Sequence, residues 1–257
     1  MESSQSHLQL AEALADDFRV YLPDRRGRGL SGSFAASYAV QNEVEDVEAL
    51  LAETGAPYVM GVSSGALVAL QASLVVPSIR KTAIFEPPLP VKGSVSMDFL
   101  PRFQQELAEG KLSSALVTGM LGAQLGPSVF NALPRWMLKR LTEMMMASED
   151  KKAKDGDVTF HMLAPTLSDD FRLVAEMSDE LERFRAMRPE VLLLGGGKSP
   201  AYLRTALDAL EKSLPRVRRV TFPSLGHGAT GNANRGGKPK IVARELRRFF
   251  ASSPDAY

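Results

Sequence analysis

Hydrophobic residues along this chain occur in two alternating patterns, short apolar runs and runs with a spacing of three or four positions. Short apolar runs predict buried strands, and the wider spacing predicts helices with one apolar face. The predicted strands cover residues 18–22, 58–60, 82–85, 189–194 and 217–222. The predicted helices cover residues 7–15, 40–51, 66–76, 200–214 and 239–250. This alternation predicts an α/β fold, with a mostly parallel sheet covered by helices on both faces.

The alternation stops between residues 91 and 188. Helical patterns occur there at 99–107, 113–121, 136–146 and 171–184, without a convincing strand. We therefore expect a helical cap insertion at 91–188, within a core formed by residues 1–90 and 189–257. The charged stretch 148–157 is predicted to be an exposed loop of the insertion. In the helix that follows the next strand, Ser199 is the expected N-cap and Pro200 the expected first helical residue.

Composition narrows the class of protein. With 257 residues the chain fits one large domain with an insertion, and no apolar run approaches the ~20 residues of a membrane span. A formal net charge of +1 argues against binding to nucleic acid. Without cysteine there is no disulfide and no thiol nucleophile, and three scattered histidines do not suggest a metal site. We expect no cofactor. The first residues lack the features of a signal peptide, so a cytoplasmic location is expected.

The segment Gly-Val-Ser-Ser-Gly at 61–65 stands between a predicted strand and a predicted helix. This context is typical of a nucleophile elbow, in which a sharp turn holds a serine, here Ser63, in a strained backbone conformation. Glycine is expected at both flanking positions, 61 and 65, because a residue without a side chain lets neighbouring backbone come close. The hydroxyl would then lie at a helix N-terminus, where backbone N–H groups stabilise developing negative charge.

Three further motifs accompany the elbow. They are Asp-Arg-Arg-Gly-Arg-Gly at 24–29, Glu-Pro-Pro at 86–88 and Gly-His-Gly at 226–228. In this order the four motifs resemble a branch of the α/β-hydrolase family, and the resemblance covers nearly the whole chain. It implies an eight-stranded parent fold, a helical cap, and a serine, acid, histidine order along the chain. The arginines at 25, 26 and 28 suggest an anion site, but a structural turn is the preferred interpretation.

The resemblance implies a role for each candidate residue. His227 is the expected general base of Ser63, and Glu86 is the expected acid, because the alternative position at 197–200 carries no carboxylate. Asp208, in the middle of a predicted helix, is a poor rival. The backbone N–H of Ser64 is the expected oxyanion donor, while the side chains of Val62 and Ser64 are expected only to pack.

The predicted cap is rich in methionine, which suits an apolar substrate pocket. The candidate pocket residues are Trp136, Met137 and Met162, and the alternative, that they only form the core of the cap, stays open. The sequence thus indicates a carboxylic-ester hydrolase acting on an ester, lactone or thioester of an apolar small molecule, with no nucleic-acid or membrane partner. A hydrolase-fold protein that only binds a ligand, and a lyase or cyclase, are the alternatives. The oligomeric state is unknown.

The chain departs from the family pattern in its N-terminal part. In the family a buried strand and a His-Gly loop precede the helix that starts here near His7. That strand normally lies between the strands at Val20 and Tyr58, and its loop donates a second oxyanion N–H. We expect either a truncated chain or direct pairing of the two remaining strands.

Overall fold

The structure is a computed structural model, and it describes residues 1–33, 38–125 and 128–252. Its four strands form one parallel sheet in the order β1-β2-β3-β4, which are Tyr58–Val62, Lys81–Phe85, Glu190–Gly196 and Val217–Phe222. Each of these strands coincides with a predicted one. The predicted α/β class with a parallel sheet is therefore confirmed.

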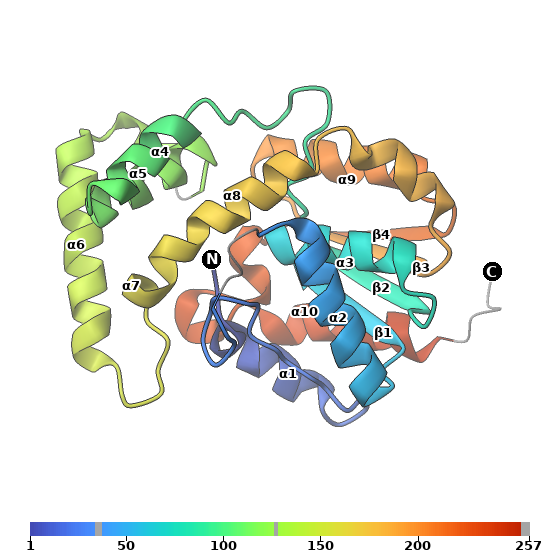
Figure 1. Cartoon of the computed structure of the whole chain (residues 1–257). Coiled ribbons are helices and arrows are strands. Elements are labelled where there is room, and N and C mark those ends of the chain that lie inside the picture. Colours follow the sequence, from blue (N-terminus) through green and yellow to red (C-terminus); the bar gives the residue numbers. More distant parts are fainter. Residues whose placement is uncertain (34–37, 126–127, 253–257) are drawn as a thin grey trace.

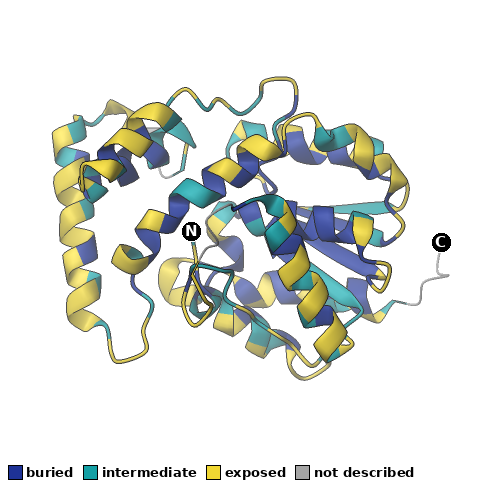
Figure 2. Cartoon of the chain, in the orientation of Figure 1, coloured by how far each residue is buried: buried dark blue, intermediate teal, exposed yellow. Residues whose placement is uncertain are grey.

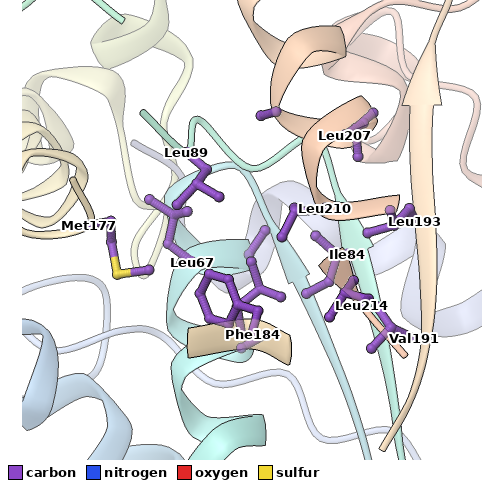
Figure 3. Close-up of a cluster of buried hydrophobic side chains, with 14 of the residues drawn as sticks. Leu67, Ile84, Leu89, Met177, Phe184, Val191, Leu193, Leu207, Leu210 and Leu214 are labelled. Atoms are coloured by element: carbon purple, nitrogen blue, oxygen red, sulfur yellow. The ribbon is translucent and has the colours of Figure 1, made fainter. Parts of the chain in front are cut away.

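Helices cover both faces of the sheet (Figure 1). Helices α3 (Ser64–Val75) and α9 (Ala201–Ser213) pack on one face, and α1 (Leu8–Leu14) and α10 (Pro239–Ala251) pack on the other. Alternate strand residues point to opposite faces, so Ile84 joins the first apolar cluster while Phe85 joins the second. Figure 3 shows the first cluster, where side chains of α3 and α9 meet those of β2 and β3.

Helix α2 (Val40–Thr54) packs against α3 beside β1. The remaining elements are η1 (Ser4–His7), α4 (Leu100–Ala108), α5 (Leu112–Gly122), η2 (Ser128–Ala132), α6 (Arg135–Lys152), α7 (Phe160–Leu163), η3 (Ala164–Thr166), α8 (Leu167–Glu176), η4 (Glu180–Ala186), η5 (His227–Thr230) and η6 (Ala233–Arg235). Within the described ranges, no helix combines the length and the apolar character that crossing a membrane requires.

Residues 91–188, called the helical region below, contain no strand in their described part. Helices α4, α5 and α6 gather on one side of the molecule, and α8 runs from them toward α3 (Figure 1). These helices share an apolar cluster of their own, which includes Phe103, Leu116 and Phe171. The C-terminal half of α8 instead joins the cluster of the sheet through Leu173 and Met177. Helix α8 thus links the two apolar clusters.

Two predicted boundaries in the helical region are wrong. The pattern at 171–184 is not one helix, because α8 ends at Glu176 and a separate 3-10 helix, η4, begins at Glu180. Asp179 between them has a positive φ of 64°, a conformation that ends an α-helix. The predicted loop at 148–157 is helical up to Lys152, since α6 continues through its charged residues. Figure 2 shows that most of α6 is exposed, which explains why its end carries no apolar pattern.

The predicted strand at 18–22 is wrong. This segment has no ladder partner, its residues Val20 and Tyr21 are 36% and 40% exposed, and β1 forms the edge of the sheet. Direct pairing of this segment with the strand at Tyr58, one of the two alternatives for the N-terminal part, is also absent from the described residues. An extended segment becomes a strand only when its N–H and C=O groups bond to a neighbour. The segment is held instead by Phe18, whose ring packs edge-on against Phe250.

Candidate active site

The elbow forms as the sequence predicts. Ser63 lies between the end of β1 and the start of α3, with φ 53° and ψ −124°. A Cβ at Gly61 would lie 2.3 Å from the carbonyl oxygen of Gly65, so only glycine fits that position. A Cβ at Gly65 would meet nothing within 4 Å outside the backbone of its own helix, so the expectation that this position must lack a side chain is wrong.

Ser63, His227 and Glu86 form a continuous hydrogen-bonded chain. The Nε2 atom of His227 lies 3.1 Å from Ser63 Oγ, and its Nδ1 atom lies 2.7 Å from Glu86 Oε2. Ser63 is half-buried and His227 is 23% exposed, so a small molecule can approach both. The three residues come from the ends of β1, β2 and β4, because carboxyl ends of parallel strands meet at one edge of a sheet.

Glu86 directly follows β2 and is fully buried. Its Oε1 atom accepts a hydrogen bond from the backbone N–H of Gly196 at 2.6 Å, while Oε2 faces His227. Both carboxylate oxygens therefore have a partner, which offsets the cost of burying the charge. Burial and the nearby Glu86 carboxylate raise the pKa of Tyr202 to about 12, so the Tyr202 hydroxyl stays protonated.

Ser64 is the first residue of α3, where a backbone N–H has no acceptor inside the helix. This is the position expected for the oxyanion donor. The expectation that the Ser64 side chain only packs is wrong. Its Oγ donates a hydrogen bond to Asp170 at 2.7 Å and accepts one from Arg25 at 3.0 Å. No spacing rule reveals these contacts, because the three residues lie far apart in the chain.

Asp170 lies at the centre of a buried charge network. Its carboxylate lies 2.9 Å from Arg25, 2.7 Å from Arg28 and 3.2 Å from the N-terminal ammonium of Met1. Burial opposes ionisation of Asp170, but these cations outweigh it and hold its pKa well below the usual range. Glu43 pairs with Arg25 at 2.7 Å on the other side. The feature of the sequence that could have indicated this network is the carboxylate at 170, which lies on the apolar face of its helix.

The arginine motif is structural. Arg25 and Arg28 are bound to carboxylates of the network, and Arg26 pairs with Asp46 at 2.8 Å. Asp24 accepts hydrogen bonds from the backbone N–H groups of Ser4 and Leu30, at 2.7 and 3.1 Å. These contacts thus agree with the preferred interpretation as a structural turn. Each of the three arginines is paired with a carboxylate, so none of them supports the anion-site alternative.

A cavity of about 450 Å³ opens beside His227. It is bounded by the end of α5 and the segment after it, by η2, and by the segment before α9. Its lining residues are Met120, Leu121, Gln124, Leu125, Phe130, Asn131, Lys198, Ser199, Pro200 and His227. Trp136, Met137 and Met162 do not line it, and Trp136 and Met162 are 67% and 61% exposed. Of the methionines, Met120 is the one that faces this cavity.

The other titratable candidates lie outside this arrangement. His161 is 60% exposed and lies 3.2 Å from Asp150. Asp208 pairs with Arg219 on the surface, in keeping with its dismissal as the acid. In the part of the chain that the structure describes, no three His, Cys, Asp or Glu side chains are grouped so that they could hold a metal ion.

Comparisons with known proteins decide the family. The model of the Alpha/beta hydrolase family matches residues 3–235. The chain belongs to this family. Its similarity to an α/β-hydrolase from Sphaerobacter thermophilus extends over 97% of this chain and 89% of that structure, with 30% identity and a TM-score of 0.74. An esterase from Thermogutta terrifontis shares the fold, with a TM-score of 0.68, 17% identity, and coverage of 96% and 85%.

The chain is also similar in sequence to an esterase. A pimeloyl-[acyl-carrier protein] methyl ester esterase from Xanthomonas campestris pv. campestris is 27% identical over 255 residues. The match covers 95% of this α/β-hydrolase and 89% of the relative. Esterases thus occur among the similar proteins found by sequence as well as by structure.

Proposed function

We propose that this α/β-hydrolase cleaves a carboxylic ester, lactone or thioester of an apolar small molecule, with Ser63 as nucleophile. The observation that carries the proposal is the hydrogen-bonded chain Ser63, His227, Glu86 beside an open cavity. A serine hydroxyl in contact with a histidine that is itself oriented by a buried carboxylate is the arrangement required for acyl transfer. The methyl ester esterase among the relatives supports the same class of reaction.

In the proposed reaction, Ser63 Oγ attacks the carbonyl carbon and its proton passes to His227 Nε2. The tetrahedral intermediate then expels the leaving group, which takes the proton from His227. A water molecule repeats the sequence on the acyl-enzyme, so that the acid is released and Ser63 regains its proton. Glu86 is a positioning residue, since its carboxylate holds the Nδ1–H tautomer and stabilises the imidazolium.

The backbone N–H of Ser64 is the proposed oxyanion donor, because it opens α3 directly after the nucleophile. We also propose residues 91–188 as the cap over a core formed by 1–90 and 189–257. In support, α5 and η2 provide one wall of the cavity, and the segment before α9 provides the opposite wall. The wall from the helical region is mainly apolar, which favours an apolar acyl or alkyl group.

The proposal is tested with a fluorophosphonate probe and with methyl and p-nitrophenyl esters of short fatty acids. We expect covalent labelling and turnover with the native chain, and neither with Ser63→Ala. A matched control is Ser178→Ala, at an unrelated site in the helical region, which should label like the native chain. Equal labelling of the native chain and Ser63→Ala would overturn the proposal.

A second candidate function is ligand binding without hydrolysis. The observation that favours it is that β1 lies at the edge of the sheet in the part of the chain that the structure describes, so no strand there lies beyond β1 to bring a second backbone N–H toward Ser63. Loss of one such donor typically lowers turnover by about 10²–10³. Tight binding that persists in Ser63→Ala and His227→Ala, without turnover of any ester, would favour this candidate. Product analysis separates either function from a lyase or cyclase reaction.

A further inference from the structure

One end of the cavity beside His227 is polar and positively charged. Lys198 and Ser199 line it, directly before α9. Lys198 is exposed and forms no ion pair with any carboxylate of the described residues. Its ammonium is therefore available to a ligand, whereas the arginines of the motif at 24–29 are paired with carboxylates.

Ser199 has a buried hydroxyl that lacks a partner. The residue is 4% exposed, and within the described chain its Oγ atom has no hydrogen-bond partner. The expectation that Ser199 caps α9 is wrong, because Pro200 occupies the N-cap position and the helix begins at Ala201. A buried hydroxyl without a partner costs free energy, and the Oγ atom of Ser199 is closed off from the cavity.

The backbone around these two side chains is fixed. Lys198 donates its N–H to the carbonyl oxygen of Leu225 at 2.9 Å, and the guanidinium of Arg204 binds the Ser199 carbonyl oxygen at 2.6 Å. The carbonyl of Ser199 is thus occupied, and Lys198 supplies the polar side chain that a ligand can reach. The N-terminus of the 13-residue helix α9 lies at the same end of the cavity and adds a partial positive charge.

The wall from the helical region is mainly apolar. Met120, Leu121, Leu125 and Phe130 line it, together with the polar residues Gln124 and Asn131. A ligand that fills the whole cavity therefore has an apolar portion and an anionic group. The charged part of the lining offers a single ammonium, together with the helix N-terminus. That set balances one negative charge, which favours a carboxylate over a phosphate.

We propose that this α/β-hydrolase prefers esters whose acyl chain carries a free carboxylate, and that Lys198 binds that carboxylate. This inference rests on the proposed function, since it names the substrate class of the same site. The ester group is placed at His227 and Ser63, and the apolar chain lies along Met120 and Phe130.

The test compares two methyl esters of equal chain length, monomethyl adipate and methyl hexanoate. The native chain should show the higher kcat/KM for monomethyl adipate. In Lys198→Gln the ratio of the two kcat/KM values should fall roughly tenfold, because a charge-assisted hydrogen bond to the carboxylate is lost. Lys212→Gln, at the far end of α9, should keep the native ratio. A native ratio at or below one would overturn the inference while leaving ester hydrolysis intact.

Binding provides a readout without turnover. Calorimetry with Ser63→Ala should show tighter binding of monomethyl adipate than of methyl hexanoate, weakened by added salt. The double variant Ser63→Ala, Lys198→Gln should lose that difference, and Ser63→Ala, Lys212→Gln should keep it. If no ester is turned over, the proposed function fails, and this binding experiment still decides the inference. Equal binding of the two esters to Ser63→Ala would overturn it.

Discussion

The Ser64 hydroxyl donates a hydrogen bond of 2.7 Å to the Asp170 carboxylate, although the two residues are 106 positions apart. Ser64 directly follows the proposed nucleophile, and Asp170 belongs to helix α8 of the helical region. The bond therefore ties the turn that holds Ser63 to the region proposed as the cap. Because Asp170 also binds Arg25 and Arg28, three parts of the chain meet at this carboxylate.

Asp170→Asn should destabilise the protein strongly. The substitution keeps the shape but removes the negative charge between two buried arginines, and breaking a buried ion pair costs about 3–5 kcal/mol. Urea unfolding at pH 7 measures this loss. Since the folded pKa of Asp170 is depressed, its contribution is present above the ordinary pKa and is lost as the pH falls. The difference between native and variant stability should therefore shrink below about pH 4.

The control for this variant is the neighbouring Asp169→Asn. Burial raises the pKa of Asp169, so its charge does not stabilise the fold, and the substitution should be neutral or slightly stabilising. An equal loss of stability in the two variants would show that Asp170 has no special role.

Gly61→Ala should distort the elbow. The added Cβ would lie 2.3 Å from the Gly65 carbonyl oxygen, a backbone atom that can move only if the turn opens. Overpacking of this kind costs about 1–3 kcal/mol, and it should also slow fluorophosphonate labelling of Ser63. Thermal unfolding and labelling rate measure the two effects.

The matched control is Gly65→Ala, where the Cβ meets nothing within 4 Å. Its unfolding free energy should change by less than about 1 kcal/mol, because alanine is favoured over glycine in a helix. A Gly61→Ala protein as stable and reactive as Gly65→Ala would contradict the argument from backbone contact.

Glu86→Gln should lower kcat by up to about 10⁴, with little change in KM. The side-chain oxygen of glutamine would accept the Gly196 N–H, which leaves the amide NH₂ facing His227 Nδ1. The histidine would then carry its proton on Nε2 and could not accept the proton of Ser63. A pH–rate profile measures the change, which a purely structural defect would not produce.

Glu86→Asp retains the charge and should recover part of the rate. Glu53→Gln, an exposed residue of α2, removes the same charge far from the site and should match the native chain. If Glu86→Gln retained native turnover and pH profile, another group would have to orient His227.

His7→Gln should alter the pH dependence of stability. Burial lowers the pKa of His7, but its bond to Glu2 at 2.9 Å outweighs burial, so the folded pKa is raised above 6.5. The pair therefore stabilises the fold below the unfolded pKa, and its contribution disappears as the pH rises through the folded pKa. Because Glu2 is 44% exposed, the effect should be about 1 kcal/mol or less.

Thermal unfolding of native and His7→Gln proteins at pH 6 and pH 9 measures this contribution. The two proteins should differ at the lower pH and converge at the higher one. His161→Gln, an exposed histidine, serves as the control and should show a smaller difference. A difference that grew toward pH 9 would contradict the sign of the shift.

The sequence was sufficient to predict the strands of the sheet and the elbow. The runs at 82–85 and 189–194 predict β2 and β3 because both faces of these strands are buried, which favours apolar residues at most positions. Glycine at 61 reveals the turn at Ser63 because a Cβ there would meet the Gly65 carbonyl oxygen, whereas the loop of His227 is predicted from the Gly-His-Gly motif at 226–228. The candidate triad could therefore be named before its members were seen together.

Only the tertiary structure decided which groups meet at long range. The segment 18–22 has strand-like composition, but it becomes a strand only with a neighbour, and no strand of the described residues pairs with it. The bond between Ser64 and Asp170, and the cavity residues Met120 and Lys198, depend on how helices from distant parts of the chain pack. Local patterns report backbone conformation and burial, whereas such contacts arise from packing, which no spacing along one chain records.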